Sequence, residues 1–345
     1  MSVEEISKIL INAREPEDVF SGKSIDEIKH EYRKMAKICH PDVVKSEYMD
    51  LAQRTTSLLN KFYESAIKKI ENGIYGVKDK KLIYKTKDIL FSFDNRGKTY
   101  DIYSCILEED ISVVYEGLCD GKIIRIKIVN DECDNELLLN EYEILKKYNH
   151  LGLPKVLGNV KINGRVALIY DDEFGLSVEE IKKEYEYFPE EHIAWILERM
   201  LSLIGYLHSN KLVHGNIKSD NVFIDVDNHN VKISDYSFCI TDASKKESKY
   251  KIVNDLYSPS YVSKDSLVIP NVDIYATGKI AIELIGGDIR RDAMPLRVSI
   301  EMRNFIRKLL DKNSNDAWAL WNELIELRNK LYGKTRFQKL ERKLK

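Results

Sequence analysis

Apolar side chains recur at helical spacing in two neighbouring stretches near the start of the chain. The first stretch opens with Ser24 and Glu27, a capping box in which each side chain satisfies a backbone amide at the helix start. Its apolar residues share one face at i, i+4, i+7 and i+8: Ile28, Tyr32, Met35 and Ala36. The second stretch keeps a helical register through Leu51, Thr55, Leu58, Leu59, Phe62 and Ala66. The pattern predicts two helices that bury their apolar faces against each other.

A His-Pro-Asp tripeptide, His40 to Asp42, separates the two predicted helices. The residue before a proline is disfavoured in helical conformation, so we expect the first helix to end ahead of Pro41. Basic side chains lie on that helix ahead of the turn: Lys29, Arg33, Lys34 and Lys37. The sequence predicts an antiparallel hairpin with a basic face next to its turn, although a solvated surface is the ordinary alternative for such a charge run.

This hairpin resembles the J-domain family. Residues Ile28 to Asp42 are similar to the second helix and signature loop of that family, and Leu59 to Glu64 are similar to its third helix. Members use the loop and the basic face to engage a heat-shock-seventy chaperone and trigger its ATPase. The resemblance implies a chaperone-binding site made of His40, Pro41, Asp42, Lys29, Arg33, Lys34 and Lys37.

Strand-like and helix-like patterns follow a charged linker at Lys78 to Lys81. Alternation over Leu82 to Phe93 predicts a strand, and two further strands, residues 111–117 and 122–128, are joined by a turn at Asp120-Gly121. Pro189 opens a long amphipathic helix with Ile193, Ile196, Leu197, Met200, Ile204 and Leu207 on its apolar face. We expect a β-rich part followed by a helical part, with the domain boundary near residue 80.

The stretch from His214 to Ser237 has the layout of a protein-kinase catalytic loop followed by a metal-binding strand end. In that layout Asn221 and Asp235 match the two magnesium ligands. Lys218 matches the lysine that contacts the transferred phosphate in Ser/Thr kinases. The position of the proton-accepting aspartate holds Asn216, and an amide has no basic lone pair near neutral pH. The metal ligands are therefore present and the general base is missing.

The resemblance to protein kinases extends over residues 88 to 332. Lys127 matches the lysine that holds the α- and β-phosphates, and Glu141 matches its ion-pair partner on the following helix. The three glycine positions of the phosphate-covering loop fall on Leu107, Glu109 and Ser112. Side chains there obstruct the backbone amides, and the Glu109 carboxylate repels an anion, which opposes nucleotide binding.

Other kinase motifs are altered. Asp235-Tyr236-Ser237 occupies the position of the usual Asp-Phe-Gly, and Ser263-Lys264-Asp265 occupies the position of Ala-Pro-Glu. The stretch from Asp273 to Gly278 is similar to the buried helix whose aspartate ties down the catalytic-loop backbone. That structural role survives whether or not the chemistry does.

Composition narrows the functional classes. The chain has 345 residues, enough for two domains, and a formal net charge of −2, which argues against a general nucleic-acid coat. No apolar run approaches the roughly 18 residues of a membrane span. The cysteines have no metal-ligand spacing, which favours reduced thiols and a cytoplasmic location: Cys39, Cys105, Cys119, Cys133 and Cys239.

The sequence predicts an α+β, multidomain protein. We expect a J-domain-like all-α module over residues 1–76, a linker over 77–87 and a bilobal protein-kinase-like domain over 88–335. That domain has a β-rich small lobe and an α-rich large lobe, and residues 336–345 form a basic tail.

Two functional interpretations remain open. The main prediction is a J-domain co-chaperone whose second domain is a catalytically impaired pseudokinase that acts as an adaptor or nucleotide sensor. The alternative is an active or weakly active Ser/Thr protein kinase with an appended J-domain. The kinase resemblance implies ATP and magnesium as cofactors, and the loss of the glycine-rich loop opposes their binding. A heat-shock-seventy chaperone and a protein client or substrate are the expected partners.

Overall fold

The N-terminal module is helical, with α1 (Val3–Asn12), α2 (Ile25–Cys39) and α3 (Met49–Glu71) around one apolar core. This computed structural model describes residues 1–13, 15–71, 75–76, 88–172, 174–226, 228–242, 254, 256–263 and 266–333. The helix α2 begins at the predicted capping box, where the amide of Glu27 donates to Ser24 Oγ at 3.3 Å. The helix α1, which the sequence analysis did not predict, begins at a second capping box formed by Ser2 and Glu5.

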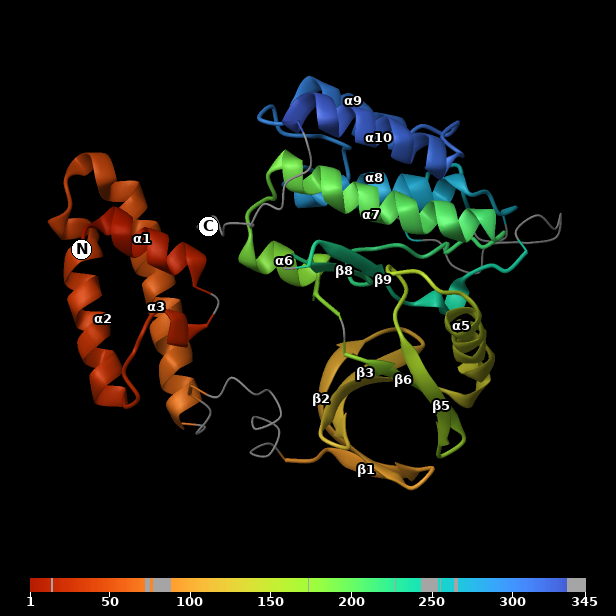
Figure 1. The fold of residues 1–345 in the computed structure, drawn as a ribbon, viewed down its shortest axis with the longest axis horizontal. Helices are drawn as coiled ribbons and strands as arrows, with labels where there is room; N and C mark the ends of the chain where they lie inside the picture. Colours follow the sequence, from red (N-terminus) through yellow and green to blue (C-terminus); the bar gives the residue numbers. More distant parts are fainter. Residues whose placement is uncertain are drawn as a thin grey trace.

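Helices α2 and α3 lie side by side and antiparallel, as Figure 1 shows. The rings of Tyr32 and Tyr63 stack across them with centroids 4.2 Å apart, and the Tyr32 hydroxyl donates to Asn60 Oδ1 at 2.9 Å. The helix α2 ends at Cys39, and Pro41–Val43 form a short 3-10 turn. The His-Pro-Asp tripeptide therefore lies where α2 leads into the turn to α3.

The small lobe is an antiparallel sheet in the order β1-β2-β3-β4-β6-β5. Its strands are β1 (Phe91–Asn95), β2 (Lys98–Glu108), β3 (Ser112–Cys119), β4 (Lys122–Val129), β5 (Val156–Ile162) and β6 (Arg165–Asp171). In Figure 1 the sheet curls, with α5 (Asn135–Lys147) beside it. One apolar cluster fills the curl and includes Ile102, Ile126 and Ile169.

The large lobe consists mainly of helices, with a short sheet at the boundary with the small lobe (Figure 1). The helices are α6 (Val178–Glu184), α7 (Glu190–Ser209), α8 (Asn271–Leu284), α9 (Ile300–Leu309) and α10 (Ala317–Tyr332). The sheet has the order β7-β8-β9, from β7 (Leu176–Ser177), β8 (Val222–Asp225) and β9 (Asn230–Ile233). Every apolar residue predicted for α7 is buried. Pro189 is the N-cap residue, one position ahead of the first helical residue, and makes no side-chain capping hydrogen bond.

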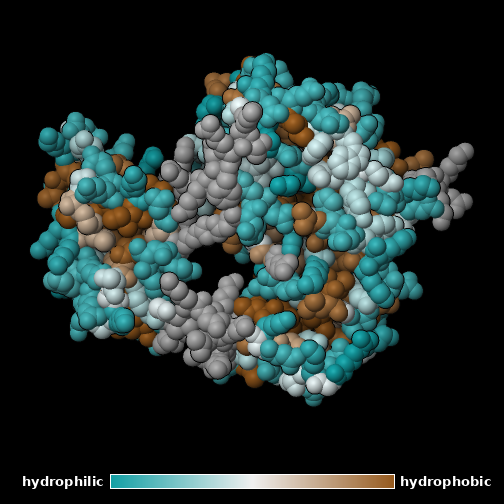
Figure 2. Space-filling view, in the orientation of Figure 1, coloured by the Kyte–Doolittle hydropathy of each residue, from teal (hydrophilic) through white to brown (hydrophobic). Residues whose placement is uncertain are grey.

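A single large core joins the two lobes. It includes Leu138 and Leu145 of α5 and Leu168 of β6 together with the buried faces of α7 and α8. Figure 2 shows hydrophilic side chains over much of the viewed face, with hydrophobic patches over the strands of the small lobe. Within the described ranges, every helix is too short or too polar to cross a bilayer.

Three predicted features lie outside the described residues. They are the linker over residues 77–87, the basic tail over 336–345, and Lys264 and Asp265 at the position of Ala-Pro-Glu. The predicted strand over Leu82 to Phe93 is described only from residue 88, and β1 begins at Phe91. The domain boundaries inferred from the sequence therefore stay predictions.

Candidate active site

A buried aspartate of α8 holds the loop that leads from α7 into β8. The backbone amides of His214 and Gly215 donate to the two Asp273 carboxylate oxygens at 2.9 and 2.8 Å. The ring of His208 lies 3.0 Å from the same carboxylate, and His214 Nε2 lies 3.0 Å from the backbone oxygen of Ser234. Burial lowers the pKa of His214, so the neutral ring holds the loop instead of exchanging protons at pH 7.

Lys127 lies at the centre of a buried polar network. Its Nζ is 2.9 Å from Glu141 Oε2 on α5, 2.6 Å from Asp235 Oδ1 and 3.0 Å from Ser237 Oγ. The Ser237 hydroxyl also donates to Glu141 at 2.8 Å, and the Tyr170 hydroxyl donates to it at 2.9 Å. Burial acts to lower the pKa of Lys127, but the neighbouring carboxylates raise it above its usual value, so the lysine is charged. The structure thus brings the predicted lysine and glutamate together.

Asn216 contacts the predicted metal ligand Asp235. The Asn216 amide nitrogen donates to Asp235 Oδ2 at 2.7 Å, and its side chain is buried. Asp235 adopts a left-handed backbone conformation, with φ 66° and ψ 65°, which persists in non-glycine residues only where the surroundings enforce it. Burial acts to raise the pKa of Asp235, but Lys127 lowers it to about 2. Asn216 therefore donates a hydrogen bond where a base would accept a proton.

The other metal-ligand candidate, Asn221, is built into the loop. Its Oδ1 accepts from the amide of Lys218 at 2.9 Å, and its Nδ2 donates to the backbone oxygen of Asn216 at 2.5 Å. Carboxylate and amide oxygens are the ligands that magnesium prefers, so Asp235 and Asn221 fit the ion chemically. A bound cation would compete with Lys127 and Asn216 for the oxygens of Asp235.

Glu109 reaches from the loop after β2 into the same site. Its carboxylate oxygens lie 3.8 Å from Lys127 Nζ and 3.8 Å from Lys218 Nζ, and the Ser112 hydroxyl donates to it at 3.0 Å. The side chain is only 10% exposed. Burial and the nearby Asp235 carboxylate raise the pKa of Glu109. A residue at a predicted glycine position thus places a carboxylate between the two lysines of the site.

The cleft between the lobes is small, about 60 Å³. Glu109, Lys127 and Asp235 are among the residues that line it. Arg125, Phe174 and Phe223, which the sequence analysis did not single out, also line it. Arg125 lies two residues before Lys127 on the same strand, and side chains two residues apart lie on the same face of a strand. This spacing was the signal in the sequence that Arg125 lines the cleft.

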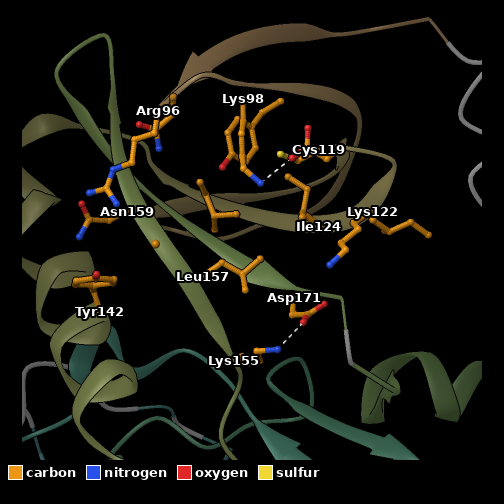
Figure 3. Close-up of a pocket in the computed structure, with 16 residues that line it drawn as sticks. Arg96, Lys98, Cys119, Lys122, Ile124, Tyr142, Lys155, Leu157, Asn159 and Asp171 are labelled. Carbon is orange, nitrogen blue, oxygen red and sulfur yellow. Dashed lines mark hydrogen bonds and ion pairs between the residues drawn. The ribbon is translucent and has the colours of Figure 1, made fainter.

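A larger cavity of about 610 Å³ opens on the curled sheet, away from these residues (Figure 3). Basic side chains surround it, among them Arg96, Lys98, Lys122 and Lys155. Ion pairs of 2.6 Å between Lys98 and Asp120 and 3.1 Å between Lys155 and Asp171 neutralise part of that charge. None of the predicted site residues lines this cavity.

The predicted chaperone-binding residues lie on the surface of the N-terminal module. The side chains of His40 and Asp42 are 51% and 88% exposed, with His40 Nδ1 3.5 Å from Asp42 Oδ2. The predicted basic side chains of α2 are exposed as well: Lys29, Arg33, Lys34 and Lys37. The structure places a histidine, an aspartate and a basic helix face where another protein can reach them, and their role stays a prediction.

A curled sheet over a helical lobe, with a buried lysine-glutamate pair and an aspartate-anchored loop, defines a protein-kinase fold. The protein kinase domain model matches residues 108–335, more than half of the chain. The chain therefore belongs to the protein kinase family, whose members in general bind ATP and magnesium. The N-terminal helical module lies outside the matched residues.

Curated relatives of the kinase domain are named as kinases. The chain is 29% identical over 155 residues to the serine/threonine-protein kinase PAK mbt of Drosophila melanogaster, covering 44% of this chain and 24% of that protein. It is 26% identical over 216 residues to the serine/threonine-protein kinase PAK 1 of Mus musculus, covering 61% and 39%. It is 28% identical over 218 residues to the cyclin-dependent kinase-like 1 of Caenorhabditis elegans, covering 61% of each. The chain thus spans between a quarter and three fifths of these relatives.

Proposed function

We propose that the kinase domain is a weakly active Ser/Thr protein kinase, the alternative that the sequence left open. The observation that carries this proposal is the buried network in which Lys127 contacts both Glu141 and Asp235. Relatives named as Ser/Thr kinases support the same function. This support is stronger than the support for a co-chaperone as the main function.

In this proposal the side chains position a nucleotide and a hydroxyl without a general base. Lys127 and Lys218 would hold phosphate oxygens, and Asp235 and Asn221 would hold magnesium, which neutralises phosphate charge when it is bound. The Asn216 side-chain oxygen can accept a hydrogen bond and orient the substrate hydroxyl, but it cannot take the proton at neutral pH. Loss of a general base typically costs about 10²- to 10⁴-fold, so we expect slow transfer.

Phosphoryl transfer to a mixed pool of Ser- and Thr-containing peptides, with labelled ATP and magnesium, tests this function. We expect slow transfer by the full chain, none by Asp235→Ala, and faster transfer by about 10²-fold in Asn216→Asp. The proposal is wrong if neither the native chain nor Asn216→Asp exceeds Asp235→Ala. Binding of ATP without transfer would then favour the nucleotide-sensing pseudokinase, and no binding would favour the adaptor.

We also propose that the N-terminal module docks on a heat-shock-seventy chaperone. The favouring observation is the exposed His40–Asp42 turn beside the exposed basic residues of α2. We expect the full chain to stimulate ATP hydrolysis by such a chaperone and Asp42→Asn to abolish the stimulation. Asp50→Asn, an exposed aspartate at the start of α3, is the matched control and should retain it. Equal stimulation by the two variants would contradict this docking role.

A further inference from the structure

Arg125 packs its guanidinium into the cleft against two aromatic rings. Its Cζ lies 4.5 Å from the ring centroid of Phe174 and 5.5 Å from that of Phe223. Its Nε donates to Asp172 at 2.7 Å, and the side chain is 16% exposed. A planar cation on aromatic faces, held by a carboxylate, is an attractive and well-determined arrangement. The same rings offer a stacking surface of the kind that nucleotide bases use.

Glu109 lies close to the two lysines of the cleft. A carboxylate 3.8 Å from both Lys127 and Lys218 gives these cations an anionic neighbour. In the proposed kinase function the same two lysines would hold phosphate oxygens. A phosphate that binds to these lysines therefore replaces the Glu109 carboxylate as their anionic neighbour. The carboxylate repels the phosphate unless Glu109 moves away.

The two side chains leave little free volume. The cleft holds about 60 Å³, whereas pockets that bind small molecules and cofactors enclose roughly 300–1,000 Å³. Water occupies about 30 Å³ in the liquid, so the remaining space suits a few water molecules at most. A nucleotide can enter only if side chains of the lining are displaced.

We propose that Arg125 and Glu109 form a cleft plug that competes with the nucleotide, Arg125 in the place of the base and Glu109 in the place of the phosphates. This inference rests on the proposed kinase function, because that function supplies the nucleotide. The plug is closed when both side chains lie in the cleft. The apparent affinity for ATP is the affinity of the open cleft multiplied by the fraction of molecules in which the plug is open. Anything that draws Arg125 or Glu109 out of the cleft raises that affinity, so the plug is a control point.

Half-ligands separate the two parts of the plug. Adenosine reports on the Arg125 side, and inorganic triphosphate with magnesium reports on the Glu109 side, each measured by calorimetry on the full chain. We expect Arg125→Ala to tighten adenosine binding about tenfold without changing triphosphate binding. We expect Glu109→Gly to tighten triphosphate binding about tenfold without changing adenosine binding. The double variant should bind ATP more tightly than the native chain by about 10²-fold, because independent effects on affinity multiply.

The matched control variants lose the same kind of charge at exposed positions outside the cleft. Glu108→Gly removes an exposed carboxylate next to Glu109, and Lys122→Ala removes an exposed cation from the strand of Arg125; neither should change any affinity. If Arg125→Ala fails to fold in a thermal melt, Asp172→Asn serves instead, since it releases the guanidinium from its ion pair. Native ATP affinity equal to that of the double variant would overturn the plug, as would control variants that tighten binding equally.

A phosphoryl-transfer assay on the same samples distinguishes failure of the plug from failure of the proposed kinase function. Tight ATP binding and transfer by the native chain would overturn the plug and leave the kinase function standing. Tighter binding by the double variant, with no transfer by any chain including Asn216→Asp, would support the plug and overturn the kinase function. Absence of nucleotide binding in every variant would overturn the plug.

Discussion

The His-Pro-Asp turn and the kinase cleft each pair an aspartate with a basic side chain, in opposite surroundings. At the turn, His40 and Asp42 lie 3.5 Å apart with exposures of 51% and 88%. In the cleft, Lys127 and Asp235 lie 2.6 Å apart with exposures of 5% and 8%. Exposed ion pairs contribute little to folding, whereas breaking a buried pair leaves a desolvated charge. The proposed docking at the turn therefore does not depend on a contribution of these residues to the fold. The cleft pair contributes to the fold as well as to the proposed nucleotide site.

The largest expected effect is loss of the buried cation. Lys127→Met leaves the carboxylates of Glu141 and Asp235 without their shared partner, and we expect a loss of about 3–5 kcal/mol in the free energy of unfolding. Urea unfolding measures it, with Lys122→Met, an exposed lysine of the same strand, as the control. Equal unfolding midpoints for the two variants would mean that the cleft pair contributes no more than an exposed pair.

A smaller effect is expected when the amide at the base position becomes a carboxylate. Asn216→Asp replaces the hydrogen bond to Asp235 with two carboxylates in contact, which should cost about 1–3 kcal/mol without magnesium. Magnesium should restore part of the loss, because a bound cation would offset the repulsion between the carboxylates. Thermal melts with and without magnesium measure both changes. A melting temperature that is unchanged without magnesium would contradict the contact between Asn216 and Asp235.

A buried histidine on α7, His192, extends the comparison to the pH dependence of stability. Burial lowers the pKa of His192 from 6.5 to about 4, and its Nδ1 accepts a hydrogen bond from Trp195 Nε1 at 3.1 Å. The folded state binds fewer protons than the unfolded state between pH 4 and 6.5, so stability rises with pH through that interval. His192→Gln should flatten the rise in urea unfolding measured across it. The same slope in His192→Gln and the native chain would exclude this histidine as the cause.

The smallest expected effect on stability lies at the turn. His40→Gln replaces a side chain that is half exposed, so the free energy of unfolding should change by no more than about 0.5 kcal/mol. The same substitution should abolish stimulation of a heat-shock-seventy chaperone if the proposed docking is correct. Urea unfolding and the stimulation assay on one preparation separate the two readouts. A loss of several kcal/mol would show that the turn supports the fold.

Local patterns in the sequence predicted much of the helical structure and the central contact of the cleft. The apolar face of α7 follows from its periodicity, and Lys127 and Glu141 follow from motifs on adjacent elements. The helix α1 was missed although Ser2 and Glu5 form a capping box ahead of its apolar residues. The stacking of Arg125 on Phe174 and Phe223 could not be predicted, because periodicity carries no information on which distant segments meet.

The strand β1 decides where a shortened version of this protein can begin. It pairs with β2 from Phe91 opposite Ile102 to Asn95 opposite Lys98, ahead of the first residue that the family model matches. A fragment starting at residue 108 would keep only the last residue of β2 and would lose the buried side chains of Tyr100 and Ile102. The strand β3 would then become an open edge able to pair with other chains. Fragments for crystallisation or ligand screening should therefore begin before Phe91.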